Sequence, residues 1–484
     1  MASPSYTEFS RQGQEKMERD DQNKLNVIIV GAGLGGLGAA IAILLAGHNV
    51  TILEAAREIG EVGAGIQVLP NAAKVLFSWG VEEQLNRHAT RPRQCNFLGW
   101  KGNHLSKMDY HGYARAAGAP FLDFHRANLH SCLLDRAVEL GGNIMTNAQV
   151  QNFAISEDDT TASVLLADGR VLVADLIVGA DGINSTLREV FLGRQDPPQP
   201  TGDLAYRLLL NTTDMLDDPE LRPMVESPQV NYWVGPGAHA VSYVLRGGEF
   251  FNVVLLVPDD LPPDVAANTA AGDVAEMRAH FAGWDPRLRK LALLGSGEKS
   301  TILKWRLCIR PGLDPTWSHP SGAFTMLGDA VHATLPYLAS GAGMSLEDGG
   351  VLGLCLGRLA DKSPTSKQRA LRAYEACRRE RTEKVVERGT YNQWIYHLPD
   401  GPEQEDRDRR FRAFGESDQR WLAEGSPVLP ESQETGDDPF PWRYHGVARW
   451  LLTYDMWKDV EARWSQYALP LPVSDHPHPT RPNL

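Results

Sequence analysis

The sequence predicts an α/β fold in which a Rossmann-type domain is combined with an antiparallel sheet and a helical C-terminal region. Three observations support this prediction. Residues 27–53 follow the order strand, glycine-rich turn, helix and strand, as in a βαβ unit. Residues 206–257 contain β-rich segments separated by glycine turns that suit hairpins. Residues 366–396 show one long, charged helical pattern.

The composition is that of a globular protein. The chain has 484 residues, 42% of them hydrophobic and 23% charged, which is enough for a large core and two or three domains. Its net charge of −13 disfavours binding to nucleic acid or to an anionic membrane. The cysteines are Cys95, Cys132, Cys308, Cys355 and Cys377. They form no C-x-x-C pair, which is typical of reduced thiols, and with no hydrophobic signal region we expect a cytoplasmic protein.

Residues 26–50 are apolar for long enough to raise the alternative of a membrane span. However, the segment contains six glycines and divides into a strand, a turn and a short helix. These features fit a buried βαβ unit better, so we predict no transmembrane segment.

The turn of this unit, GAGLGG at residues 31–36, matches the pattern G-x-G-x-x-G. Gly31, Gly33 and Gly36 allow a tight turn, close approach to a pyrophosphate and close helix–strand packing. The following helix offers free N–H groups to phosphates. Glu54 ends the second strand, where a carboxylate binds ribose hydroxyls. A glycine turn without a ligand would explain fewer of these features, so we predict a dinucleotide site.

Further motifs follow along the chain, and each alone has an ordinary structural explanation. Residues 63–71 form a loop of small residues that ends at a Pro-Asn helix start. Arg126 lies at a strand-to-helix junction, where a solvated surface charge is the usual explanation. Asp-Gly at 181–182 and Gly-Asp at 328–329 each follow an apolar strand, at the edge where ligands collect in α/β sheets. Another helix begins near residues 341–343.

Taken together, the chain resembles the class A flavoprotein aromatic hydroxylases, which have the p-hydroxybenzoate hydroxylase fold. The resemblance is greatest to a salicylate hydroxylase-like branch with many fungal enzymes. It is carried by the ordered motifs GAGLGG, Glu54, GAGIQVLPNA, HRANL, VGADGINSTLR and GDAVHATLPYLASGAGMSLEDG. We therefore expect a flexible tail at 1–24, an FAD-binding domain at 25–200 and 324–395, a β-rich substrate domain at 201–323, and an irregular and helical cap at 396–484.

The resemblance implies FAD as the cofactor and a role for each matching residue. The residues so implied are Gly31, Gly33 and Gly36 at the pyrophosphate, Glu54 at the adenosine ribose, Gly65 and Gln67 near the flavin, Arg126 beside the phosphates, Asp181 at the segment for FAD and NAD(P)H, Asp329 at the ribityl chain, and Pro336, Ala342 and Gly343 against the ring. NAD(P)H is expected to bind transiently, because no second G-x-G-x-x-G follows a strand.

The helix that begins near Ala342 would point free N–H groups at the negative charge of reduced flavin. We interpret Glu347 and Asp348 as acids of its first turn, which suit the helix dipole. His332 has no His or Cys partner at metal-binding spacing, so we interpret it as structural and expect no metal site.

Candidate substrate residues lie in the β-rich region, which we expect after a linker at 197–204. Tyr206-Arg207 resembles the pair that opens this sheet in related fungal hydroxylases, and in some relatives the arginine holds a phenolate or guides the reacting oxygen. An arginine within an apolar strand also needs an anion or an acidic partner. Tyr232 and Tyr243 could hydrogen-bond a substrate hydroxyl, although half-buried sheet tyrosines are the more ordinary explanation of both. The candidate catalytic residues are Arg207, Tyr243 and Tyr232.

The C-terminal third is expected to be mainly helical. We interpret the charged helix at 366–396 as a solvated face and the polar, acidic residues 400–440 as an irregular connection. Residues 450–457 resemble the terminal cap of the family.

These features predict a monooxygenase that uses NAD(P)H and O2 to hydroxylate a phenolic or other electron-rich aromatic small molecule through a flavin C4a-hydroperoxide, in aromatic catabolism or secondary metabolism. A cation such as Arg207 would stabilise the reactive phenolate. Epoxidation of an alkene or an indole in a biosynthetic pathway is an alternative, and so is a flavin-binding protein without turnover. The sequence leaves open the substrate, the choice between NADPH and NADH, and whether the protein is a homodimer.

Overall fold

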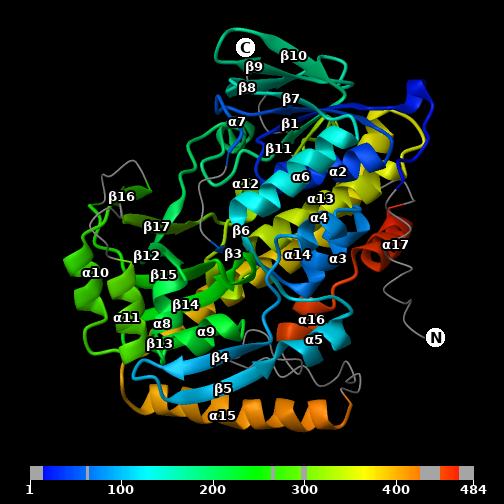
Figure 1. The fold of residues 1–484 in the computed structure, drawn as a ribbon. Coiled ribbons are helices and arrows are strands. Elements are labelled where there is room, and N and C mark those ends of the chain that lie inside the picture. The colour runs from blue at the N-terminus through cyan, green and yellow to red at the C-terminus, as the bar shows by residue number, and fades with distance from the viewer. Residues whose placement is uncertain (1–14, 61–64, 263–267, 296–301, 426–446, 468–484) are drawn as a thin grey trace.

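The computed structural model describes residues 15–60, 65–262, 268–295, 302–425 and 447–467 (Figure 1). Its first layer is a parallel sheet with the strand order β18-β11-β1-β2-β7. These strands are β1 (Asn26–Val30), β2 (Asn49–Leu53), β7 (Asn143–Met145), β11 (Leu176–Gly179) and β18 (Phe324–Met326). β1 pairs in parallel with both β2 and β11, which makes it the central strand. The predicted Rossmann-type sheet is therefore confirmed.

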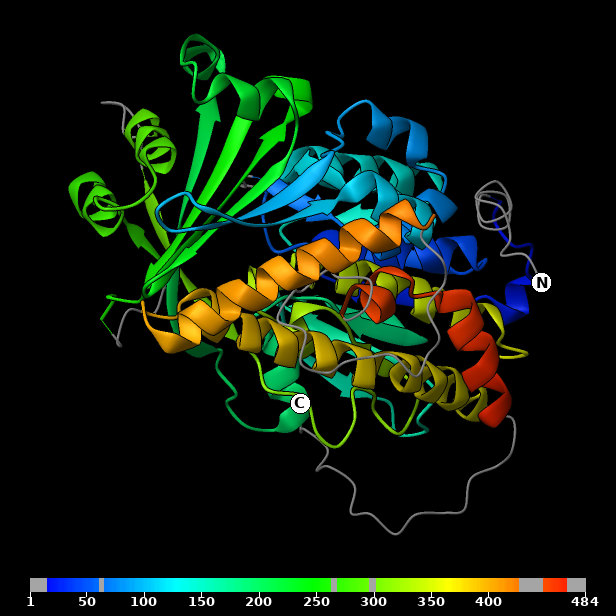
Figure 2. The same cartoon turned by 90° about the horizontal axis from the view of Figure 1, so that it is seen from below.

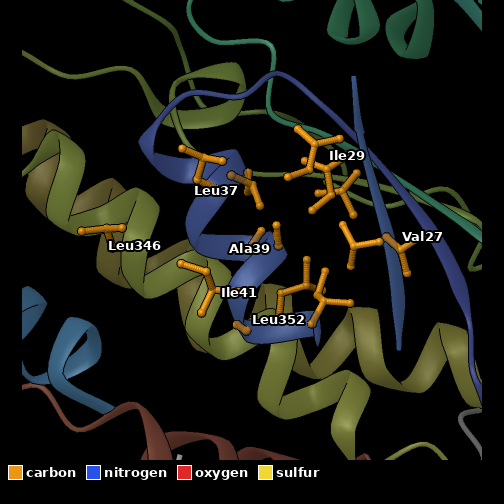
Figure 3. Packing of buried hydrophobic residues seen from close by; sticks show 14 of the residues in the cluster. Val27, Ile29, Leu37, Ala39, Ile41, Leu346 and Leu352 are labelled. Carbon is orange, nitrogen blue, oxygen red and sulfur yellow. The ribbon is translucent and has the colours of Figure 1, made fainter. Parts of the chain in front are cut away.

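Helix α2 (Leu34–Leu45) packs between this sheet and α13 (Gly341–Gly357), with α6 (Arg126–Glu139) on its other side (Figure 1). Figure 3 shows Val27 and Ile29 of β1 in the same buried apolar cluster as Leu37 and Ile41 of α2. Burial of each such aliphatic side chain contributes about 1.5–3 kcal/mol to the stability of the folded state. A Cβ on Gly353 of α13 would lie 2.6 Å from the Ala42 Cβ, so glycine allows the two helices to approach closely.

The second layer is an eight-stranded sheet in the order β16-β17-β12-β15-β14-β13-β4-β5. Its strands are β4 (Gln94–Gly99), β5 (His104–Asp109), β12 (Gln199–Asn211), β13 (Val230–Gly235), β14 (Ala238–Leu245), β15 (Phe250–Pro258), β16 (Thr269–Ala271) and β17 (Leu303–Ile309). All neighbours are antiparallel except β13 and β4. The linker expected at 197–204 is wrong from residue 199 onward, because β12 begins there and pairs with β17. β4 and β5 join the sheet although they precede residue 201.

One face of the eight-stranded sheet packs against short helices, and the opposite face shares an apolar cluster with Met344 of α13 and with the C-terminal residues Ile395 and Phe411. The short helices are α8 (Thr213–Asp217), α9 (Arg222–Glu226), α10 (Val274–His280) and α11 (Pro286–Leu294). Since neighbouring residues of a strand point to opposite faces, Tyr206 faces these helices and Arg207 faces away from them. The candidate substrate residues Arg207, Tyr232 and Tyr243 therefore share the face opposite the short helices.

The remaining elements connect these layers. The strands are β3 (Gly65–Val68) paired with β6 (Leu122–His125), and a three-stranded sheet of β8 (Val150–Ile155), β9 (Ala162–Leu166) and β10 (Val171–Ala174). The helices are α3 (Pro70–Ser78), α4 (Glu82–Asn86), α5 (Tyr110–Ala117), α7 (Thr186–Leu192) and α12 (Asp329–His332), with short 3₁₀ turns at Asp21–Asn23, Arg246–Gly248 and Pro336–Leu338. No helix among the described residues is long and apolar enough to cross a membrane.

The C-terminal region contains α14 (Pro364–Tyr396), α15 (Pro402–Ala423), α16 (Val447–Leu452) and α17 (Met456–Gln466). Figure 2 shows α14 and α15 as two long helices joined by a short turn. The irregular connection expected at 400–440 is therefore wrong for residues 402–423, and 426–440 lie outside the described residues. Phe411 and Trp421 explain the difference, because these two aromatic anchors are buried against Phe97 and Tyr113. α14 is also not a solvated face, since it buries Arg378 completely.

The flexible tail expected at 1–24 needs a correction for residues 15–24, because this segment is hydrogen-bonded to the first layer. Met17 N–H donates to the Leu45 oxygen at 2.8 Å. The Arg19 guanidinium donates to the main-chain oxygens of Gly357 at 2.7 Å and Leu359 at 2.8 Å, where α13 ends. A third contact at 3.3 Å reaches the oxygen of Ala46, which follows α2. One cation thus caps the C-terminal ends of both helices.

We expect Arg19→Ala to lower the free energy of unfolding by about 1–2 kcal/mol, because carbonyl groups at two helix ends lose a charged donor. Chemical denaturation followed by circular dichroism would measure this loss. Lys16→Ala is the control, since the exposed Lys16 amino group makes only one long contact, at 3.4 Å, with a main-chain oxygen. Equal stability of the two variants would contradict a capping role for Arg19.

Candidate functional site

The glycine turn between β1 and α2 has the geometry of a phosphate cradle. Gly31 has φ +107°, and a Cβ there would lie 2.3 Å from the Ala180 oxygen. A Cβ on Gly36 would lie 2.0 Å from the Gly31 oxygen. A Cβ on Gly33, in contrast, would meet nothing within 4 Å, and no side chain caps the helix that begins at Leu34. Free N–H groups at the start of α2 therefore face open space, which fits a pyrophosphate.

Glu54 lies directly after β2 and beside this turn. Its carboxylate accepts the N–H of Ala32 at 3.0 Å and that of Ala56 at 2.8 Å. His130 contacts the Ala32 oxygen at 2.7 Å and fixes the turn from the opposite side. Because a carboxylate offers about four acceptor positions, Glu54 can still accept ribose hydroxyls.

Asp329 lies at the carboxyl end of β18, as the sequence predicts. The preceding Gly328 has φ +63°, a conformation that favours glycine. The Asp329 side chain is exposed to solvent, yet burial by surrounding protein raises the pKa of its carboxyl, an effect opposed by His332 and Arg126. Because the Asp329 carboxyl is accessible to solvent and yet has protein around it, it lies in a recess of the protein surface. The structure therefore brings Arg126 and Asp329 into electrostatic range of each other, although they are far apart in the sequence.

The first turn of α13 leaves polar groups without partners. The helix begins at Gly341 as predicted, and Ser340 gives it no side-chain cap. The buried atoms Thr334 Oγ1 and Asn71 Oδ1 have no hydrogen-bond partner among the described residues. Both residues border this turn, since a Cβ on Gly341 would lie 3.6 Å from Thr334 and one on Gly343 would lie 3.8 Å from Asn71 Nδ2. Free backbone donors and unpartnered side chains in one place fit the polar edge of a flavin ring.

The remaining cofactor candidates lie around these elements. Pro336 opens the 3₁₀ turn just before α13, and Ala342 is in the first turn of that helix. Asp181 has both carboxylate oxygens engaged, one with Ser185 Oγ at 2.6 Å and the other with the Leu187 N–H at 3.0 Å. It thus holds the start of α7, and its role toward FAD or NAD(P)H stays a prediction.

The interpretation of Glu347 and Asp348 as acids of the first helical turn is wrong. Both lie in the second turn of α13, and both are completely buried. Arg378 contacts each carboxylate at 2.8 Å. The acids are explained by partners from α14, not by the helix dipole.

Arg207 is a half-buried cation without an acidic partner among the described residues. Burial lowers the pKa of its guanidinium, Tyr243 raises it, and the nearby cation Arg126 lowers it further. Its Nε is buried and has no hydrogen-bond partner, while the guanidinium lies 5.2 Å from the centre of the Trp305 ring. The need for an anion, which the sequence predicts, is not met within the part of the chain that the structure describes.

The two candidate tyrosines differ in their surroundings. The Tyr243 ring lies against strand β3, because a Cβ on Gly65 would come within 2.4 Å of it. Tyr232 is stacked on Phe97 with ring centres 4.9 Å apart, inside an aromatic core that also contains Phe411. Tyr243 is therefore placed between the sheet and the predicted flavin loop, and Tyr232 is placed in a packing environment. Their roles with substrate stay predictions.

Sequence reasoning missed Asn252 on β15. Its Oδ1 accepts the Gly65 N–H at 2.9 Å, which fixes the amide orientation and leaves the buried Nδ2 without a partner. Asn252 is opposite Tyr243 and Leu209, so it lies diagonally next to Arg207 on the same face. The available signal was one asparagine inside the apolar run FFNVVLLVP.

A buried carboxyl, Asp123, was also missed. It lies on β6 opposite Gln67 of β3, and Gln67 Nε2 donates to its Oδ1 at 3.1 Å. Burial raises the pKa of Asp123 to about 8, although the Gln67 hydrogen bond opposes this. Among the described residues it has no cationic partner. Near neutral pH this carboxyl is therefore mostly protonated, next to the residue predicted to face the flavin.

Asp123→Asn should stabilise the protein increasingly as the pH rises. Because the pKa is higher in the folded than in the unfolded state, the stability linked to this proton is complete below about pH 4 and is lost on the way to about pH 8. The amide does not titrate, so the melting temperature of the variant should exceed that of the wild type most clearly near pH 9. Asp135→Asn, at an exposed position of α6, controls for the loss of one charge. A melting difference independent of pH would contradict the assignment.

Comparisons with known proteins agree with this geometry. Residues 24–241 match a family model described as an FAD binding domain. The chain is 41% identical to the FAD-dependent monooxygenase OpS4 of Beauveria bassiana (strain ARSEF 2860), over 87% of this chain and 94% of that protein. It is 32% identical to a 3-amino-4-hydroxybenzoate 2-monooxygenase of Streptomyces cremeus, over 86% of this chain and 99% of that protein.

A solved structure of a salicylate hydroxylase substrate complex matches with a TM-score of 0.72 at 21% identity, over 92% of this chain and 98% of that one. The predicted p-hydroxybenzoate hydroxylase fold is thereby confirmed, and so is FAD as the cofactor, with NAD(P)H as the reductant typical of this class. The alternative of a flavin-binding protein without turnover is not supported. The chain belongs to the class A FAD-dependent monooxygenases.

Proposed function

We propose that this monooxygenase hydroxylates a phenolic or other electron-rich aromatic small molecule that carries an anionic oxygen. The observation that carries the proposal is Arg207, a cation that lies near Tyr243 and Arg126 and pairs with no acid among the described residues. Removing a cation from water costs free energy unless an anion pairs with it. A phenolate or carboxylate of the substrate would supply that anion.

We also propose that the cofactor is held by the residues that form the recess. Gly31, Gly33 and Gly36 would surround the pyrophosphate, with Glu54 at a ribose. Arg126 and Asp329 would lie along the chain that joins the two ends of FAD, and the start of α13 would face the flavin ring. FAD, reduced by NAD(P)H, supplies the activated form of oxygen.

The protein would contribute orientation and the exclusion of water. Arg207 would hold the substrate oxygen as an anion, which makes the ring a better nucleophile. The buried aromatic face around Tyr232 and Tyr243 would keep water from the reacting atoms. The relative from Streptomyces cremeus is named for a benzoate substrate, and such a compound carries an anion of this kind. An uncharged alkene or indole would leave Arg207 unpaired, so epoxidation is the less supported alternative.

The test is NAD(P)H oxidation by FAD-loaded protein with a panel of hydroxybenzoates, phenols and indoles. We expect anionic or readily ionised aromatics to accelerate oxidation, with little hydrogen peroxide released. Acceleration by neutral indoles or alkenes alone would favour epoxidation. Unchanged oxidation with every aromatic compound would overturn the proposal.

A further inference from the structure

A buried ionic network lies behind the Gly328–Asp329 turn. We define it by its members, Glu347 and Asp348 of α13, His332 of α12, and Arg378 and Arg381 of α14. The two carboxylates and Arg378 are completely shielded from solvent. Two carboxylates face two guanidinium groups, so the charges balance within the network. No part of the proposed reaction uses these groups.

Within the ionic network, Asp348 makes the contacts that reach the turn. Its Oδ2 accepts the Gly328 N–H at 3.0 Å and lies 2.6 Å from His332 Nε2. Its Oδ1 accepts from Arg378 Nε at 2.8 Å. Gly328 and His332 are the residues on either side of the short segment that begins with Asp329. One carboxylate therefore fixes both ends of that segment.

We propose that Asp348 is a positioning residue for the cofactor, which holds the Gly328 turn and His332 so that the Asp329 side chain is directed into the recess. The proposal rests on the proposed role of Asp329 toward FAD. Asp348 itself would not contact the cofactor. It would set the geometry of the cofactor site through the Gly328 turn and His332.

The conformation of the turn explains why such an anchor is needed. Gly328 has φ +63°, and a Cβ there would lie 2.9 Å from Ser345 Oγ, so the turn is both unusual and tightly enclosed. Asp348 is a permanent anion for this purpose. Burial alone would raise the pKa of Asp348, but His332 and Arg378 lower it to about 2. The anchor therefore keeps its negative charge at neutral pH.

Glu347 provides a matched comparison within the same network. It is the next residue of the same helix, is equally buried, and pairs with Arg378 and Arg381. Its remaining contact is Asn71 Nδ2 at 2.7 Å, and it does not touch the Gly328 turn. Arg381 continues to the main-chain oxygens of Trp450 at 2.8 Å and Leu451 at 2.9 Å. Glu347 thus joins α13 to the C-terminal cap, and Asp348 joins it to the cofactor turn.

The experiment compares Asp348→Asn, Glu347→Gln and Asp329→Asn in the full chain. The dissociation constant of FAD is measured by flavin fluorescence on reconstitution of the apoprotein, and the midpoint potential of bound flavin by dye-coupled reduction. We expect Asp348→Asn to weaken FAD binding by about 10- to 100-fold and to shift the potential, because the turn loses a charged acceptor. Glu347→Gln should destabilise the apoprotein to a similar extent. It should change FAD affinity by less than about threefold, because the glutamine oxygen can still accept from Asn71 Nδ2 and the Gly328 turn is untouched.

The outcomes separate the inference from the function on which it rests. Equal FAD affinity of Asp348→Asn and Glu347→Gln would overturn the positioning role. Unchanged affinity in Asp329→Asn would instead contradict the placement of the cofactor. If Asp348→Asn does not fold, His332→Leu removes one contact to the same carboxylate, and His332→Gln can restore a donor there. FAD affinity should then fall in the leucine variant and recover in the glutamine variant, and equal affinities would overturn the proposal.

Discussion

Arg207→Met should lower substrate turnover by about 10- to 100-fold, since the substrate anion loses a charge-assisted hydrogen bond. The same change should make the substrate-free protein more stable. Arg207 is half-buried without an acid, and replacing an unpaired cation by an apolar side chain of similar volume removes a desolvation cost. Product formation at saturating NAD(P)H and chemical denaturation of the same preparations would measure the two opposite effects.

Arg306→Met is the matched control on the neighbouring strand β17. Arg306 is also buried, but its Nε contacts Asp259 at 2.7 Å. Removing it leaves a carboxylate without its partner, so this variant should lose stability, by about 3–5 kcal/mol. A stabilised Arg306→Met, or an Arg207→Met enzyme with normal turnover and normal preference for anionic substrates, would contradict the assignment of Arg207.

The second large effect is expected at the glycine turn, where two alanine substitutions should act differently. Gly33→Ala should fold normally and lose most of its FAD affinity, because the new Cβ meets nothing within 4 Å in the protein but projects into the space left for phosphates. Gly36→Ala should destabilise the apoprotein itself, because its Cβ would lie 2.0 Å from the Gly31 oxygen. Thermal melting of both apoproteins and fluorescence titration with FAD would distinguish the two cases.

Gly35→Ala serves as the comparison within the turn, since its Cβ would approach the Ser345 and Leu327 side chains at 3.0 and 3.1 Å, which can move slightly. An intermediate loss of stability is expected. If Gly33→Ala bound FAD as tightly as the wild type, the pyrophosphate could not lie at the start of α2.

The cofactor half of the molecule was predictable because its signals are local. The turn at 31–36, Glu54 and Asp329 each follow directly from a strand, so a few consecutive residues determine both their conformation and their position. The parallel register of β1 with β2 and β11 then brings these turns to one edge of the sheet.

The predictions that were wrong or missing share a physical cause. Whether a residue is buried depends on partners from distant segments of the chain. The sequence alone predicts Asp348 as an acid of the first helical turn, whereas its partner Arg378 lies thirty positions later in the chain. The side chain of Asn252 is oriented by a hydrogen bond from the Gly65 N–H, which lies 187 positions away in the sequence. The sequence of α15 is mostly charged, but it contains Phe411 and Trp421. These two side chains pack against Phe97 and Tyr113, which lie in a distant part of the sequence.

The central claim is that the enzyme transfers one oxygen atom from O2 to an aromatic anion held at Arg207. The most direct measurement is the mass of the product formed under ¹⁸O2 with NAD(P)H and the most stimulating anionic aromatic compound, for the wild type and for Arg207→Met. We expect one labelled oxygen in the wild-type product, and in the variant much less product with more hydrogen peroxide. A product without label, or equal yields of labelled product from both proteins, would contradict the account.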